Sequence, residues 1–179
     1  MKNWKPGPVR DQGNVGACVG HACWQFQVSD PIHTDAKIGP FDIWGEARKI
    51  DEFDDRLTEG TSVGAGLNVL KREGIIKNYY WASSVDEVIE YLLKLGPLVL
   101  GTRWSNSMFT PDSNGFIKPV GRDGGGHAYF VYGANMKEKY VRIINSWSTS
   151  WGIKGDCLMK FEYVNELLKT GGVAAAVVE

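Results

Sequence analysis

Cys18 and His127 are the residues of this sequence best suited to nucleophilic chemistry. Cys18 follows Gly16 and Ala17, and we expect it to begin a helix. A helix N-terminus presents free N–H groups and a partial positive charge, which lower the pKa of a thiol and make thiolate available at neutral pH. Cys18 is therefore a candidate nucleophile; the alternative is a small buried apolar side chain, as most free cysteines are.

His127 is the candidate base for this thiol. It follows three glycines and begins an apolar strand, and the glycines let backbone approach closely and leave space for a substrate chain. The other two histidines are weaker candidates. His21 would lie about three-quarters of a turn from Cys18 on the same helix, and His33 lies in a turn region.

Asn145 and Gln12 complete the set of candidate catalytic residues. An amide oxygen of Asn145 can hold one imidazole nitrogen and leave the other facing the thiol, with Trp147 covering that hydrogen bond. Gln12 lies six residues before Cys18, where its amide can donate to a developing oxyanion beside the Cys18 N–H. Alternatively, Asn145 only ends a strand and Trp147 belongs to the core.

The hydrophobic pattern predicts helices in the first half of the chain and strands in the second. We expect helices over 16–28 and 41–51, from Thr61 or Ser62 as N-cap to Gly74, and from a capping box of Ser84 and Glu87 to Gly96. We expect strands over 98–102, 127–132, 140–146 and 158–161, with a long polar loop at 104–126 beside the site. This order favours an α+β fold with two lobes and a substrate cleft between them.

Composition and charge exclude several classes of function. The 179 residues fit one domain or two small lobes, and a net charge of −1 predicts neither nucleic acid nor a membrane as partner. No apolar run is long enough to span a bilayer. The three cysteines and three histidines lack metal-ligand spacing and predict neither a metal site nor a disulfide framework. The simplest expectation is a cytoplasmic protein; association with a virion, or export through a trimmed leader, is the alternative.

Three blocks of the sequence resemble those of the papain family of cysteine peptidases, and they occur in the family's order. The first is 9–18, with the family's spacing from Gln12 to Cys18, and the second is Gly-His-Ala at 126–128. The third, 145–155, resembles Asn-Ser-Trp-Gly-Thr-x-Trp-Gly-x-x-Gly almost throughout. Two further matches are Trp4 and the Gly-Pro-Leu-Val run at 96–99.

This resemblance implies a papain-like α+β fold in one domain, 1–179. Its helical lobe would cover about 10–78, and its β-barrel-like lobe about 1–9 and 79–179. The implied activity is hydrolysis of a peptide or protein substrate through a thioester, without metal or cofactor. A protein inhibitor or a pro-segment outside this chain is a further expected partner.

The resemblance also implies a role for each candidate residue. A Cys18 thiolate would rest beside a His127 imidazolium, Asn145 would orient the imidazole, and Gln12 with the Cys18 N–H would hold the oxyanion. The expected substrate-binding residues are Gly60, Thr61, Ser62, Gly126, Ala128 and Trp147.

The sequence departs from the family pattern around these blocks. Val15 replaces a cysteine whose disulfide is typical of secreted members, Val19 replaces an aromatic residue, and Ser148 replaces a glycine. His127 follows Cys18 by 109 residues (127 − 18), a short spacing that indicates trimmed loops, as in compact bacterial or phage-encoded members. No departure removes a candidate catalytic residue.

Two alternative functions are compatible with the same residues. One is another Cys-His acyl transfer, such as peptidoglycan amidase or endopeptidase activity, or transglutamination. The other is an inactive binding protein that keeps the fold. The intact Gln12, Cys18, His127 and Asn145 argue against the second alternative.

Overall fold

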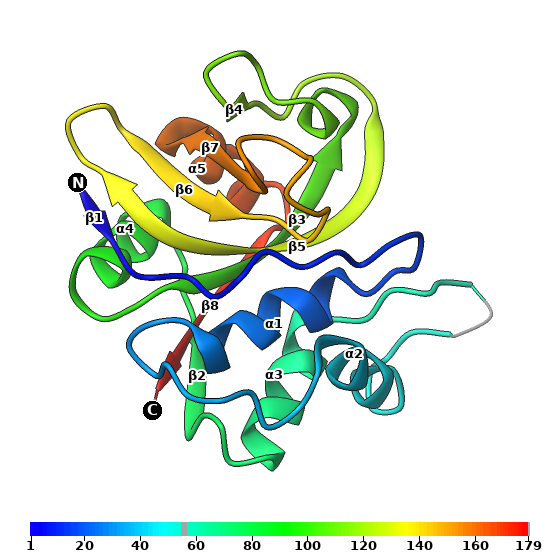
Figure 1. Ribbon diagram of the computed structural model, residues 1–179. Coiled ribbons are helices and arrows are strands. Elements are labelled where there is room, and N and C mark those ends of the chain that lie inside the picture. Colours follow the sequence, from blue (N-terminus) through cyan, green and yellow to red (C-terminus); the bar gives the residue numbers. More distant parts are fainter. Residues whose placement is uncertain (55–56, 179) are drawn as a thin grey trace.

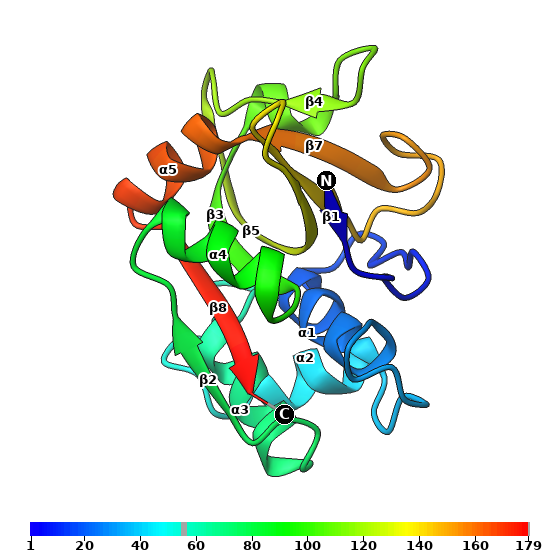
Figure 2. The same ribbon diagram turned by 90° about the vertical axis from the view of Figure 1, so that its left-hand side faces the viewer.

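A single twisted sheet organises the protein, with helices packed on both of its faces (Figures 1 and 2). The computed structural model describes residues 1–54 and 57–178. The elements of this part of the chain are β1 (Lys2–Asn3), α1 (Cys18–Val28), α2 (Pro40–Arg48), α3 (Val63–Arg72), β2 (Asn78–Trp81), α4 (Val85–Lys94), β3 (Leu98–Ser105), η1 (Asn106–Phe109), β4 (Phe116–Ile117), β5 (Asp123–Asn135), β6 (Tyr140–Ile144), β7 (Asp156–Lys160), α5 (Phe161–Lys169) and β8 (Val173–Val178). Among these strands the order in the sheet is β2-β8-β3-β5-β6-β7-β4, and β1 pairs with β5.

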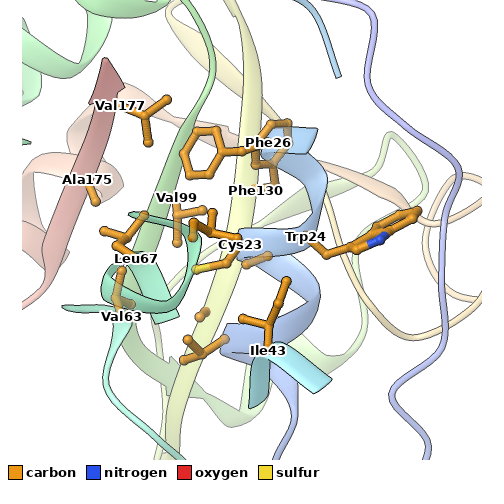
Figure 3. Close-up of a cluster of buried hydrophobic side chains, with 14 of the residues drawn as sticks. Cys23, Trp24, Phe26, Ile43, Val63, Leu67, Val99, Phe130, Ala175 and Val177 are labelled. Atoms are coloured by element: carbon orange, nitrogen blue, oxygen red, sulfur yellow. The ribbon is translucent and has the colours of Figure 1, made fainter. Parts of the chain in front are cut away.

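The long strand β5 separates two hydrophobic cores. Because successive side chains of a strand point to opposite faces, Ala128 and Phe130 pack with α1, α2 and α3, whereas Tyr129 and Val131 pack with α4 and α5. Figure 3 shows the first core, where Phe130 lies beside Phe26 of α1 with ring centroids 5.3 Å apart. The two hydrophobic cores therefore lie on opposite faces of one sheet, and α1 packs against β5.

Local capping explains where two of the helices begin. The Ser62 hydroxyl accepts the Ala65 N–H at 3.2 Å and caps α3, as predicted. The Ser84 hydroxyl caps α4 by accepting the Glu87 N–H, also at 3.2 Å. The predicted capping box is only half formed, because the Glu87 carboxylate accepts the N–H of Ser83 at 2.7 Å instead of that of Ser84.

The predicted helices are confirmed with small changes at their ends. The first begins at Cys18, two residues later than expected, and the second ends at Arg48 rather than at residue 51. The strands expected at 98–102 and 127–132 extend to 98–105 and 123–135, because β3 and β5 continue to pair beyond the apolar positions. The last two expected strands are found at 140–144 and 156–160.

The loop expected over 104–126 is wrong in part. Trp104 is buried in β3, the segment 106–109 is a short helix, and the glycines at 124–126 already belong to β5. The sequence also does not predict α5, β8 or the short strands β1, β2 and β4. The β8 strand pairs with both β2 and β3, two segments far away in sequence, which its short Ala-rich run does not indicate.

Candidate active site

One cavity of about 520 Å³ brings together residues of both halves of the chain. Cys18 contributes to it from the first turn of α1, and His127 from β5, where it pairs with Thr102 of β3. The remaining walls come from the segment before α3 and from the start of β8. The cavity therefore forms where a helix N-terminus meets the middle of the sheet.

A hydrogen bond of 2.8 Å joins His127 Nε2 to Asn145 Oδ1. The same atom of the Asn145 amide accepts the backbone N–H of Ser146 at 2.8 Å. Because an amide nitrogen cannot accept a hydrogen bond, this atom must be the oxygen, Oδ1. His127 Nε2 must then be the donor. In a neutral imidazole, this leaves Nδ1 with the lone pair, as a base requires. Asn145 is held in turn by its own N–H, which donates to Gly155 O at 2.9 Å.

Aromatic rings enclose the His127 imidazole. Trp147 stacks on it with ring centroids 4.6 Å apart and an interplanar angle of 29°, and Trp104 meets it edge-on at 4.6 Å. Trp147 is itself stacked on Phe109 and contacts Trp151 edge-on. The bond between His127 and Asn145 is buried, and Trp147 stacks on the imidazole that donates it. That Trp147 keeps water from this bond stays a prediction.

Burial shifts both groups of the candidate pair toward their neutral forms. It lowers the pKa of His127 to about 4, against the opposite but smaller effect of the Asn145 hydrogen bond. Burial also raises the pKa of the Cys18 thiol, although backbone hydrogen bonds from Ala128, Val19 and Cys18 itself act to lower it. Burial is thus the largest cause of both shifts, and each group taken alone moves toward its neutral form. The resting thiolate–imidazolium pair expected from the resemblance stays a prediction.

Gln12 is tied to the block that carries Asn145. Its N–H donates to Ser146 O at 2.8 Å, and its Oε1 accepts the Ser146 hydroxyl at 2.6 Å. Its Nε2 donates to Val15 O at 2.9 Å, which leaves the second amide hydrogen available for another acceptor. Gln12 is not among the described residues that line the 520 Å³ cavity.

The structure brings five of the six expected substrate-binding residues to this cavity, and their role stays a prediction. The five are Gly60, Thr61, Ser62, Gly126 and Ala128. The Thr61 hydroxyl donates to the Asp51 carboxylate, and Ser62 caps α3, so these two side chains hold the cleft wall in place. A side chain at Gly126 would meet open space, in line with the room expected there for a substrate.

Trp147, the sixth expected residue, is not among the described residues that line the cavity; it covers His127 instead. Sequence reasoning also missed lining residues such as Phe53, Arg103 and Val173. The only local signal was at Val173, which follows two glycines and begins an apolar run. Phe53 and Arg103 carry no comparable pattern.

The departures from the family pattern have structural consequences. Ser148 adopts φ = +62°, the left-handed region that favours the glycine of the family pattern. Its Oγ accepts the Ser150 N–H at 3.2 Å. Cys18, Cys23 and Cys157 are free thiols, and the last two are buried. In the described part of the chain, no cluster of His, Cys, Asp and Glu could hold a metal, and no helix is long and apolar enough to cross a membrane.

Comparison with a family model decides the family of the chain. The model described as "Papain family cysteine protease" matches residues 63–176, which is more than half of the sequence. The chain belongs to the papain family. The matched segment includes His127 and Asn145 and begins after Gln12 and Cys18.

Individual relatives of this papain-family chain are distant. An uncharacterised peptidase C1-like protein of Acanthamoeba polyphaga mimivirus is 21% identical over 204 aligned residues, which cover 86% of this chain. The match spans 64% of the length of that relative.

Solved structures show the same fold at low identity. The cysteine protease xylellain from Xylella fastidiosa superposes with a TM-score of 0.74 and 20% identity, covering 96% of this chain and 82% of xylellain. The bromelain protease from Ananas comosus, in complex with the E64 inhibitor, superposes with a TM-score of 0.65 and 13% identity, covering 97% of this chain and 94% of bromelain. The papain-like α+β fold expected from the sequence is confirmed.

Proposed function

We propose that this chain hydrolyses peptide bonds, with Cys18 as nucleophile, His127 as base and Asn145 as the residue that orients the base. The observation that carries the proposal is the bond from His127 Nε2 to Asn145 Oδ1. It assigns the lone pair to His127 Nδ1, in the cavity that also holds the Cys18 thiol. Membership of the papain family supports the same reaction class.

In the proposed reaction, His127 acts as a general base during attack. Because burial favours a neutral thiol and a neutral imidazole, Nδ1 takes the thiol proton as Sγ bonds to the peptide carbonyl carbon. The oxyanion accepts hydrogen bonds from the Cys18 N–H and from the second amide hydrogen of Gln12.

The tetrahedral intermediate then collapses and releases the first product. His127 returns the proton to the leaving nitrogen as the C–N bond breaks, which leaves a thioester on Cys18. Water, deprotonated by His127, then hydrolyses the thioester and regenerates the thiol. This cycle consumes one water and requires no cofactor.

A quenched fluorescent peptide library tests this proposal with purified protein. We expect cleavage by the wild type, and none by folded Cys18→Ala or His127→Ala. Cys23→Ala is the matched control, because Cys23 is a buried thiol on the same helix, and it should retain cleavage. Cleavage by Cys18→Ala would overturn the proposal. Peptidoglycan fragments and amine acceptors in the same assay test the two alternative acyl transfers.

A further inference from the structure

Two buried polar atoms on opposite elements lack a hydrogen-bond partner and share one small cavity. They are His21 Nε2 on α1 and Asn145 Nδ2 after β6, both in side chains that are at least 96% buried. The cavity lies between α1 and the strands β5 and β6, and it has a volume of about 10 Å³. This is about the volume that the centre of a single water molecule needs.

The neutral tautomer of His21 follows from its other nitrogen. His21 Nδ1 lies 2.9 Å from Ala17 O, and a carbonyl oxygen can only accept, so Nδ1 carries the hydrogen. Nε2 then has a lone pair and needs a donor. Burial is the largest cause acting on the pKa of His21 and lowers it, as the Arg10 charge also does; the Ala17 and Asp11 backbone carbonyls and the Asp11 charge act in the opposite direction without reversing the shift, so the neutral form is favoured at pH 7.

Asn145 presents the complementary group to the same cavity. Its Oδ1 is occupied by His127 Nε2 and by the Ser146 N–H, so its Nδ2 carries two hydrogens that need acceptors. A buried amide left in this state costs free energy and is freer to rotate. Rotation of this amide would move Oδ1 away from His127.

The other polar side chains that line this cavity are already engaged. The Ser146 hydroxyl donates to Gln12 Oε1, the Gln25 amide donates to Pro8 O, and the Arg10 guanidinium lies over the Trp24 ring. Among the buried side-chain nitrogens and oxygens that the structure describes around this cavity, His21 Nε2 and Asn145 Nδ2 are the two that lack a hydrogen-bond partner.

We propose that one water molecule occupies this cavity, accepts a hydrogen bond from Asn145 Nδ2 and donates one to His21 Nε2, which makes His21 a positioning residue for the His127 imidazole. The water anchors the Asn145 amide on the side opposite its bond to His127. The catalytic consequence rests on the proposed function, whereas the water site itself does not.

The direct test is a high-resolution crystal structure of the wild-type protein. We expect one density peak within hydrogen-bond distance of both His21 Nε2 and Asn145 Nδ2. Its absence, or a direct bond between the two side chains, would overturn the proposal. The His21→Leu variant should lose the peak because leucine offers no acceptor.

Kinetics then test whether His21 acts through Asn145. His21→Leu should lower kcat by roughly 2- to 10-fold with little change in KM, the effect of losing one neutral hydrogen bond. It should also shift the pH profile of Cys18 alkylation by iodoacetamide, which a purely structural role would leave unchanged. His21→Gln keeps a polar partner for the water and should recover part of the rate. It also replaces His21→Leu as the test variant if His21→Leu folds poorly.

Two further variants provide the controls. Phe41→Leu trims the ring that contacts His21 edge-on at 4.9 Å and leaves the polar atoms in place, so it should behave like the wild type. In an Asn145→Ala background, His21→Leu should have no further effect. Additive losses, or an equal loss from Phe41→Leu, would contradict positioning through Asn145. If the wild type cleaves no peptide, the proposed function fails, while the density and the alkylation profile still decide this inference.

Discussion

Removing the ring of Trp147 should move the acidic limb of the activity profile toward neutral pH. Trp147 stacks on His127 at 4.6 Å, and burial is the main cause that lowers the pKa of His127 to about 4. A protonated imidazole cannot accept the Cys18 proton, so activity is lost as the pH falls through this pKa. Trp147→Ala admits water to the imidazole and should raise the pKa toward the ordinary 6.5.

The size of the effect follows from the two limiting pKa values. At pH 5, a His127 of pKa about 4 is about 90% neutral, whereas a fully hydrated imidazole of pKa 6.5 is only about 3% neutral. Relative to its own plateau, kcat/KM of Trp147→Ala should therefore fall by up to roughly 30-fold at pH 5, while the wild type loses about a tenth.

The assay is the pH dependence of kcat/KM on one fluorogenic peptide, with folding checked by circular dichroism at each pH. Trp151→Phe is the matched control, because Trp151 contacts Trp147 edge-on and leaves the stack on His127 intact. Its limb should stay near pH 4. A wild-type limb near pH 6.5, or identical limbs in wild type and Trp147→Ala, would refute this explanation of the low pKa.

Four further predictions concern the roles of single residues. Asn145→Ala should keep measurable activity, roughly 2- to 150-fold below wild type, from the loss of one hydrogen bond; a folded variant as inactive as Cys18→Ala would show that Asn145 does more than orient. Gln12→Ala should lower the acylation rate by roughly 10- to 1000-fold in stopped-flow measurements with little change in substrate binding, and an unchanged rate would remove Gln12 from the oxyanion site. Ser148→Gly should raise the free energy of unfolding by about 1 kcal/mol, or Tm by about 2–4 °C, because glycine adopts φ = +62° without strain. A lower Tm would show that the hydrogen bond from the Ser150 N–H to the Ser148 hydroxyl contributes more to stability than the backbone strain costs. The His127 imidazole binds its proton near pH 6.5 in the unfolded state and only near pH 4 in the folded state. The free energy of unfolding should therefore fall by about 3 kcal/mol as the pH drops from 6.5 to 4. Urea titrations that show no such fall would contradict the burial of a neutral His127.

Features carried by short stretches of sequence were predictable. Ser62 and Ser84 are local caps, and each begins a helix where expected. The blocks around Cys18, His127 and Asn145 predicted that a helix end and two strands would meet. The contact between His127 and Asn145 is confirmed, because β5, which carries His127, is the antiparallel neighbour of β6, which ends just before Asn145.

Features that depend on tertiary packing were not predictable. The sequence predicts a lower thiol pKa for Cys18 from the helix end and the neighbouring His127, and it does not reveal the burial of the thiol, which is the largest cause acting on this pKa and raises it. Val173 reaches the cavity because β8 pairs with β3, a register that no local pattern of the run 173–178 specifies. His21 is a weak candidate from the sequence because it would point about three-quarters of a turn away from Cys18 on the same helix. Its place beside the small cavity that Asn145 also lines appears only when α1 packs on β5.

The central claim is that Cys18 forms the covalent intermediate, and trapping that intermediate tests it most directly. Wild-type protein is mixed with an intact peptide ester that it hydrolyses, and the reaction is quenched in acid during the initial burst of product release. The protein is then digested, and the acylated residue is mapped by mass spectrometry. We predict a thioester on Cys18, with Cys23 and Cys157 unmodified because both are buried. An acyl group on either buried cysteine, or burst turnover by the Cys18→Ala variant, would contradict the claim.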